Sequence, residues 1–177
     1  MAFETLDEVA ERELYRLYRY YWREAQRCRT AKAYLAGCVM LGSALETILM
    51  LIVSVYPEEV EATGRVPLSK GQPKPLLNWS LQELLRVAKC ARWLPSGFPD
   101  GKTQWITRNA KVGDYAEDAR SIRNLVHPAR YFLDHPGKRV TARFLDQQFK
   151  VVLACQRWLE RHNNDHLRED MRREGSL

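Results

Sequence analysis

The chain has 177 residues, and 45% of them are hydrophobic, which is enough for one domain with a buried core. Its 28 basic and 22 acidic residues give a formal charge of +6, which favours anionic partners such as RNA but fits many other functions. The four cysteines form no CxxC pair and have no histidine at a metal-ligand spacing, so the sequence predicts neither a disulfide framework nor a zinc site.

The first predicted helix runs from Leu6 to about Cys28, where apolar residues recur at helical spacing. The N-terminal residues are acidic where an export signal is basic and then apolar, which predicts a cytoplasmic protein. This helix carries an aromatic stripe that consists of Tyr15, Tyr18, Tyr21 and Trp22. Such a stripe can stack on bases, but at this spacing it is more often core or a dimer face, and we expect core.

A second helix is predicted over Ala33–Tyr56, and it is apolar on nearly all sides. The stretch is long enough to span a bilayer, but Glu46 lies near its middle, where a charge opposes insertion. We therefore expect the central helix of a soluble bundle and no membrane association. Gly37 and Gly42 on this helix let a neighbouring helix approach closely, and Pro57 closes the helix.

Two irregular segments flank the third predicted helix. Residues 57–78 hold four prolines and two glycines without periodicity, which predicts a long surface loop. The third helix is predicted to begin at Ser80, because Glu83 three residues later completes a capping box. A second irregular stretch covers residues 93–113.

The fourth predicted helix begins at Asp114, with Glu117 three positions later as a capping signal, and runs to His127. Pro128 should end or kink it, because the residue before a proline avoids the helical conformation. A last helix is predicted over about Thr141–His162, and its core-facing stripe consists of Phe144, Leu145, Gln148, Val152, Cys155 and Leu159.

The end of the chain differs in composition from the rest. Residues 163–177 contain few apolar side chains, so we expect a flexible polar tail there. The predicted fold is therefore an all-α, single-domain bundle of about five helices over residues 1–162.

One polar row on the fourth predicted helix consists of Arg120, Arg123, Asn124 and His127. Arginine can hold a phosphate through its planar guanidinium group and stabilise charge in a transition state. Histidine titrates near neutrality and can give or take the proton of a ribose hydroxyl or a leaving oxygen, so no metal is needed. On this prediction, His127 also lies at the carboxyl end of its helix, where the macrodipole favours an imidazolium.

The segment ARSIRNLVHPARY resembles the Arg/His motif of the HEPN superfamily, a group of small helical proteins that includes many RNA-cleaving toxins. Active members carry an Arg, four to six intervening residues and a His, with a polar residue such as Asn directly after the Arg. Here Arg123 is followed by Asn124, but only three residues separate it from His127. Arg120 has six intervening residues but is followed by Ser121. The order of the helices over about residues 30–162 also resembles uncharacterised HEPN-like bacterial proteins.

The resemblance implies a homodimeric, metal-independent endoribonuclease of a toxin–antitoxin or phage-defence system. RNA would be its substrate, a cognate antitoxin protein would be a further partner, and no cofactor or metal is expected. The candidate catalytic residues are carried over as a group, without a choice between the two arginines: Arg120, Arg123, Asn124 and His127.

The alternative is a non-catalytic dimeric interaction or RNA-binding module in which the same residues are structural. Glu46 lies on a helix expected to be central, and a buried carboxylate needs a partner, which an Arg of the fourth helix can supply. In that case Asn124 and His127 satisfy backbone groups. A carboxylate beside an Arg can equally hold the Arg in place for catalysis, so both interpretations remain open.

Other candidate sites are weaker. His135 precedes a Pro-Gly turn and is expected to be solvent-exposed. His162 and His166 have the i, i+4 spacing of a metal-binding pair, but they fall where the last helix is expected to fray, so no metal site is predicted. The sequence has no motif typical of dinucleotide binding, nucleoside-triphosphate binding, serine hydrolysis or zinc proteolysis.

Overall fold

The computed structural model describes residues 3–98, 109–134 and 139–173, most of which are helical. Seven α-helices lie in these ranges: α1 (Glu8–Thr30), α2 (Tyr34–Val55), α3 (Pro57–Ala62), α4 (Leu81–Cys90), α5 (Val112–Arg123), α6 (Pro128–Asp134) and α7 (Ala142–Arg173). The prediction of an all-α, single-domain helical bundle is confirmed. The five longer helices are the five predicted ones, and the short helices α3 and α6 are additional.

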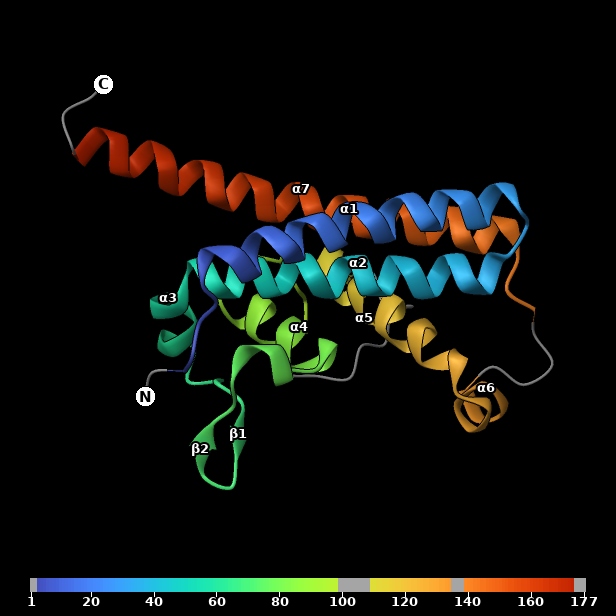
Figure 1. Cartoon of the computed structure of the whole chain (residues 1–177), viewed down its shortest axis with the longest axis horizontal. Helices are drawn as coiled ribbons and strands as arrows, with labels where there is room; N and C mark the ends of the chain where they lie inside the picture. Colours follow the sequence, from blue (N-terminus) through green and yellow to red (C-terminus); the bar gives the residue numbers. More distant parts are fainter. Residues whose placement is uncertain (1–2, 99–108, 135–138, 174–177) are drawn as a thin grey trace.

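Helix α2 lies at the centre of the bundle and contacts α1, α4, α5 and α7 (Figure 1). Its bounds differ by only one residue at each end from those predicted. The agreement is close because the continuous apolar composition of this segment indicates where the helix lies. The helix is long and apolar enough to cross a membrane, but 61% of its most apolar window is buried inside the bundle. This burial is compatible with the core helix of a soluble protein.

Helix α1 packs along α7 through aromatic and polar side chains. The rings of Trp22 and Phe149 meet edge to face at 5.3 Å, and the Tyr18 hydroxyl donates a hydrogen bond to Gln156. Tyr18 is buried, as predicted for the aromatic stripe, but Tyr15 is 56% exposed. The expectation that the whole stripe forms core is therefore wrong for Tyr15, which lies on the solvent side of α1.

The predicted loop over residues 57–78 contains regular structure. It holds α3, a two-stranded antiparallel hairpin of β1 (Leu68–Ser69) and β2 (Gln72–Pro73), and the 3-10 helix η1 (Leu76–Asn78). Pro57 closes α2 and also occupies the first turn of α3, where its missing N–H costs nothing. The prediction of an irregular loop was wrong because such short elements lack periodicity and are stabilised by buried contacts, here those of Val60 and Leu76.

The start of α4 agrees with the prediction. The Ser80 hydroxyl accepts a hydrogen bond from the Glu83 backbone N–H at 3.3 Å, and the Glu83 carboxylate accepts one from the Ser80 N–H at 2.7 Å. Lys74 adds an ion pair to the same carboxylate at 2.9 Å. The capping box predicted from the sequence is therefore present.

Helix α5 begins at Val112, two residues before the predicted start, because the capping residues are not the predicted pair. Asp114 lies inside the first turn, and its carboxylate accepts hydrogen bonds from the backbone N–H groups of Lys111 at 2.9 Å and Gly97 at 2.7 Å. Glu117, the predicted capping partner, instead forms ion pairs with Arg120, one turn farther along α5, and with Lys89 of α4.

Helix α7 continues to Arg173, eleven residues beyond the predicted end at His162. Figure 1 shows its last turns extending past the ends of α1 and α2. The predicted core stripe is buried at Leu145, Gln148, Val152, Cys155 and Leu159, whereas Phe144 is only partly buried. The predicted end of the last helix at His162 was therefore wrong, because polar composition does not prevent a helix that is already nucleated from continuing.

Candidate functional site

The contact between α2 and α5 holds one of the candidate arginines. A Cβ atom on Gly42 would lie 2.9 Å from the Arg123 Cβ and 3.2 Å from the Ala119 carbonyl oxygen, so only glycine permits this approach. One turn further along α2, Glu46 accepts a hydrogen bond from Arg123 Nη1 at 2.6 Å. The predicted pairing of Glu46 with an arginine of the fourth predicted helix, α5, is confirmed, and the arginine is Arg123.

The second candidate arginine has a different partner. Arg120 Nε lies 2.9 Å from a carboxylate oxygen of Glu117, one turn back on α5. The other oxygen of Glu117 lies 2.8 Å from the Lys89 Nζ of α4, whose side chain is almost fully buried. Glu117 therefore connects Lys89 and Arg120.

His127 does not lie on the same helical row as the arginines. Helix α5 ends at Arg123, the 3-10 helix η2 (Asn124–Val126) follows, and His127 adopts an extended conformation with φ −84° and ψ 118°. The predicted continuous helix from Asp114 to His127 is therefore wrong at its end. The physical reason is Pro128, which excludes the helical conformation at the preceding residue.

The helix-dipole argument for His127 fails for the same reason. Its backbone carbonyl accepts a hydrogen bond from the Tyr131 N–H at 3.0 Å, so His127 precedes the amino-terminal end of α6. The amino-terminal end of a helix carries partial positive charge and does not favour an imidazolium. His127 is nevertheless joined to the η2 turn, because its N–H donates to the Asn124 carbonyl at 3.0 Å.

His127 is exposed to solvent, and the described residues supply no hydrogen bond or ion pair to its imidazole ring. The scaffold interpretation expected this side chain to satisfy backbone groups, and no such bond occurs in the described ranges. Asn124 is partly buried at the start of η2. Of the four candidate residues, the two arginines have carboxylate partners and His127 presents its ring to solvent.

Apolar side chains surround this corner of the fold. Three large ones on η2 and α6 are strongly exposed: Val126, Phe132 and Leu133. Phe132 is 76% exposed, the highest value among the large hydrophobic residues that the structure describes. We refer to these three residues as the α6 patch. Large exposed apolar side chains that lie on neighbouring elements are typical of an interaction face.

Two acidic residues of α5 that sequence reasoning did not single out for their titration have shifted pKa values. Burial alone would raise the pKa of Asp114, but hydrogen bonds from Ser96, Lys111 and Gly97 outweigh it and lower the pKa. Burial, together with the neighbouring Glu117, raises the pKa of Asp118 to about 6. The only sequence signal for these two was that an acidic residue falls on a partly apolar helix.

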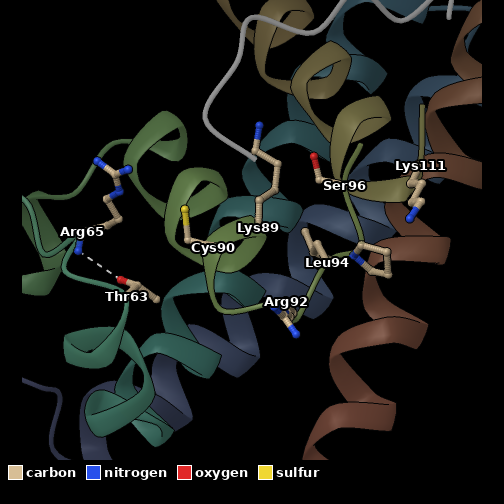
Figure 2. A pocket seen from close by; sticks show the side chains of 9 residues that line it. Thr63, Arg65, Lys89, Cys90, Arg92, Leu94, Ser96 and Lys111 are labelled. Carbon is tan, nitrogen blue, oxygen red and sulfur yellow. Dashed lines mark hydrogen bonds between the residues drawn. The ribbon is translucent and has the colours of Figure 1, made fainter. Parts of the chain in front are cut away.

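A basic pocket of about 530 Å³ is lined in part by Lys89, the lysine that pairs with Glu117 (Figure 2). Its lining comes from the segment after α3, from α4, from the segment after α4 and from the residue before α5. Four of its residues are cationic: Arg65, Lys89, Arg92 and Lys111. Lys89 connects the pocket to Arg120 through Glu117, which pairs with the charge of Lys89 itself.

The remaining histidine candidates lie elsewhere. His135 falls outside the described residues. His162 and His166 lie on α7 and face Glu59 of α3, and the helix is regular there rather than frayed. Burial lowers the pKa of His162, although the Glu59 carboxylate acts in the opposite direction.

Removing the Glu46 carboxylate is expected to destabilise the fold. Glu46→Ala leaves Arg123 without its partner, and loss of a buried partner costs about 3 to 5 kcal/mol. The Glu46 and Arg123 side chains are 17% and 34% exposed, so solvent compensates in part and we expect about 1 to 3 kcal/mol. Urea denaturation measures this loss. Glu13→Ala, which breaks an exposed ion pair on α1, is the control and should change stability by less than about 0.5 kcal/mol.

No protein-family model, curated protein or solved structure gives a significant match to this chain.

Proposed function

We propose that the chain is a cytoplasmic, metal-independent endoribonuclease that acts at the corner between α5 and α6. The observation that carries the proposal is His127, whose ring is exposed and has no bond among the described residues, although Pro128 and η2 restrain its backbone. A histidine that served as scaffold would be expected to be buried and hydrogen-bonded through its ring, and within the described residues His127 is neither. The HEPN resemblance of the same segment supports the proposal independently.

The proposed reaction needs proton transfer and charge stabilisation only. The ribose 2′-hydroxyl attacks the adjacent phosphorus, the bond to the 5′-oxygen breaks, and the products are a 2′,3′-cyclic phosphate and a 5′-hydroxyl. His127 supplies the proton that the leaving 5′-oxygen gains or accepts the proton that the 2′-hydroxyl loses. The second transfer is assigned to His127 of a second copy, because each chain presents one such histidine at the corner.

Arg123 is the arginine proposed to stabilise the phosphate. It is the last residue of α5 and joins directly to η2, which leads to His127. One guanidinium nitrogen donates to Glu46, which fixes the side chain and leaves other N–H groups for an anion. Arg120 is the alternative arginine for binding the phosphate. Glu117 would then fix its side chain, as Glu46 fixes that of Arg123.

A homodimer built around the α6 patch would bring two such corners together. The patch lies on the elements that flank His127, and apolar contact between two copies would remove it from water. The basic pocket would then supply additional contacts to RNA phosphates outside the cleavage point.

The second candidate function is a non-catalytic module that binds RNA or a protein such as an antitoxin. A specific observation favours it: both arginines already have carboxylate partners, as expected of structural residues. In that case the basic pocket and the α6 patch carry the binding function, and no bond is cleaved.

Incubation of the purified protein with a panel of single-stranded RNAs in EDTA separates the two functions. The enzyme proposal expects cleavage products that end in a cyclic phosphate, detected by gel electrophoresis and mass spectrometry. Protein that binds these RNAs with a strong salt dependence but leaves them intact would support the module. DNA of the same sequence is the control, because it lacks the 2′-hydroxyl.

The dimer makes a separate prediction. Phe132→Glu places a charge in the middle of the α6 patch and is expected to convert a dimer into a monomer, because a charge cannot be desolvated there without a partner. Sedimentation velocity at micromolar concentration measures this change. Leu77→Glu, at another exposed apolar position on η1, is the matched control and should remain dimeric. A wild-type monomer, or a dimer that survives Phe132→Glu, would contradict this interface.

A further inference from the structure

Three potential metal ligands converge at the end of the bundle opposite α6, where α3 meets α7 (Figure 1). They are Glu59, His162 and His166, and their ligand atoms all lie within 4.8 Å of one another. Glu59 Oε1 lies 3.3 Å from His162 Nε2 and 2.9 Å from His166 Nε2. One carboxylate oxygen therefore faces two imidazole nitrogens.

Both distances are short enough for hydrogen bonds, but the contacts lack hydrogen-bond geometry. Glu59 Oε1 and His162 Nε2 are both shielded from solvent, and neither has a hydrogen-bond partner among the residues that the structure describes. Buried polar atoms without a partner are uncommon, because desolvation without compensation costs about 1 to 3 kcal/mol per group. Two such atoms that face each other indicate a ligand that both of them bind.

The separations fit a metal ion in that position. Zinc bonds of about 2.0 to 2.2 Å place neighbouring ligand atoms roughly 2.9 to 3.5 Å apart, for bond angles between about 90° and 110°. Both separations from Glu59 Oε1 fall within this range. The three ligand atoms together span up to 4.8 Å, so the two imidazoles draw closer together when the ion binds. The two histidines are four residues apart on a regular helix, so they project from the same face of α7.

The surrounding residues orient the ligands. The Trp93 indole N–H donates to the second oxygen of Glu59 at 2.7 Å, which leaves Oε1 turned toward the histidines. The Tyr56 ring lies 4.9 Å from the ring of His162 and 4.7 Å from that of His166, so both imidazoles are supported by aromatic contact. Hydrogen bonds to the outer atoms of ligands and an apolar surround are typical of metal sites in proteins.

We propose that Glu59, His162 and His166 bind one Zn²⁺ ion, with water in the fourth position, and that the ion fastens α7 to α3. Imidazole ligands favour zinc and its transition-metal neighbours over Mg²⁺ or Ca²⁺, which prefer oxygen ligands. The ion would anchor α7 just before the turns that extend past the bundle. The site is separate from the proposed RNA-cleaving corner, so zinc is not a reactant there.

An ordinary ion pair between Glu59 and a protonated His166 is the rival explanation. It accounts for one of the two contacts of Glu59 Oε1, but it leaves His162 Nε2 buried and unpartnered. It also predicts no response to metal ions. The two explanations therefore differ in a direct measurement.

The test is calorimetric titration of ZnCl₂ into the full-length chain, after removal of metals and with the cysteines kept reduced. We expect one zinc per chain and a rise in melting temperature of about 5 to 10 °C at a hundredfold excess over Kd. Glu59→Gln and His166→Ala should each weaken binding at least about a hundredfold, and Trp93→Phe about 10- to 100-fold. Glu58→Gln, an exposed neighbour on α3, is the matched control and should bind as the wild type does.

Cobalt(II) provides a second readout that does not depend on the variants folding. The wild-type chain should give the visible absorption bands of tetrahedral Co²⁺ bound to nitrogen and oxygen, without the charge-transfer bands of thiolate ligands, and zinc should displace it. The proposal is overturned if the wild type binds no zinc. It is also overturned if binding persists in Glu59→Gln or if the cobalt spectrum shows thiolate ligation, which would assign the metal to the cysteines.

Discussion

Replacing His127 with alanine is expected to lower the rate of RNA cleavage by about 10²- to 10⁴-fold, the usual contribution of a general acid or base. The same change should alter the free energy of unfolding by less than about 0.5 kcal/mol, because the side chain is exposed and unbonded within the described residues. This combination separates a catalytic histidine from a structural one. Initial cleavage rates in EDTA and the melting temperature of each variant are the two measurements.

Substitutions of the two arginines test which of them binds the scissile phosphate. Arg123→Ala is expected to lower the cleavage rate by about 10²- to 10³-fold, which is the loss measured when one donor to a developing oxyanion is removed. Arg120→Ala should have a much smaller effect if Arg123 binds the scissile phosphate, because Arg120 is held by Glu117. The reverse order would assign the phosphate to Arg120. Arg123→Lys tests the guanidinium geometry, since lysine cannot form the planar fork.

One combination of results would contradict the enzyme proposal. If the wild type leaves the RNA panel intact while His127→Ala lowers the melting temperature by several degrees, the histidine is structural. The non-catalytic module then becomes the working hypothesis, and variants of Arg92 and Lys111 in the basic pocket become the next ones to test for RNA affinity.

Asp114→Ala is expected to give the largest loss of stability, about 3 to 5 kcal/mol at neutral pH. Its fully buried carboxylate accepts hydrogen bonds from the N–H groups of Gly97 and Lys111 and from the Ser96 hydroxyl. Removing the carboxylate leaves buried donors without an acceptor, and each such group costs about 1 to 3 kcal/mol. It also frees the segment after α4 from the first turn of α5.

The pH dependence of this effect has a definite sign. The pKa of Asp114 is lower in the folded protein than its ordinary value of 3.8, so its contribution is fully present above about pH 4. The contribution is lost as the pH falls through the folded pKa, and the difference between wild type and Asp114→Ala should shrink there. Denaturant unfolding at pH 7 and at pH 3 measures this. Equal differences at both pH values, or a loss under 1 kcal/mol, would contradict the role assigned to the ionised carboxylate.

The sequence was most informative where a single local rule decides the structure. The apolar composition of residues 34–55 predicted the central helix nearly to its bounds. Ser80 and Glu83 predicted the start of α4, because a capping box involves only neighbouring residues. The pairing of Glu46 with an arginine of α5 followed from the cost of burying a lone carboxylate.

The sequence was less informative at the candidate site, where two local rules compete. The spacing of the polar residues favoured a continuous helix through His127. Pro128 opposes a helical conformation at His127, and periodicity alone could not show which of these two rules decides where the helix ends. The structure shows that α5 ends at Arg123. Both arginines of α5 pair with carboxylates, whereas His127, beyond the end of that helix, is exposed and unpaired among the described residues. The linear motif does not show this difference.

By itself, then, the sequence determined an all-helical fold, its central helix and the pairing of Glu46 with an arginine. Only the tertiary structure decided which arginine meets Glu46, because the choice depends on the close approach of α5 to Gly42. Only the tertiary structure brought Glu59 to His162, since contacts between α3 and α7 join segments far apart in the chain. Local patterns report the conformation of neighbouring residues, whereas such long-range contacts depend on how the whole bundle packs.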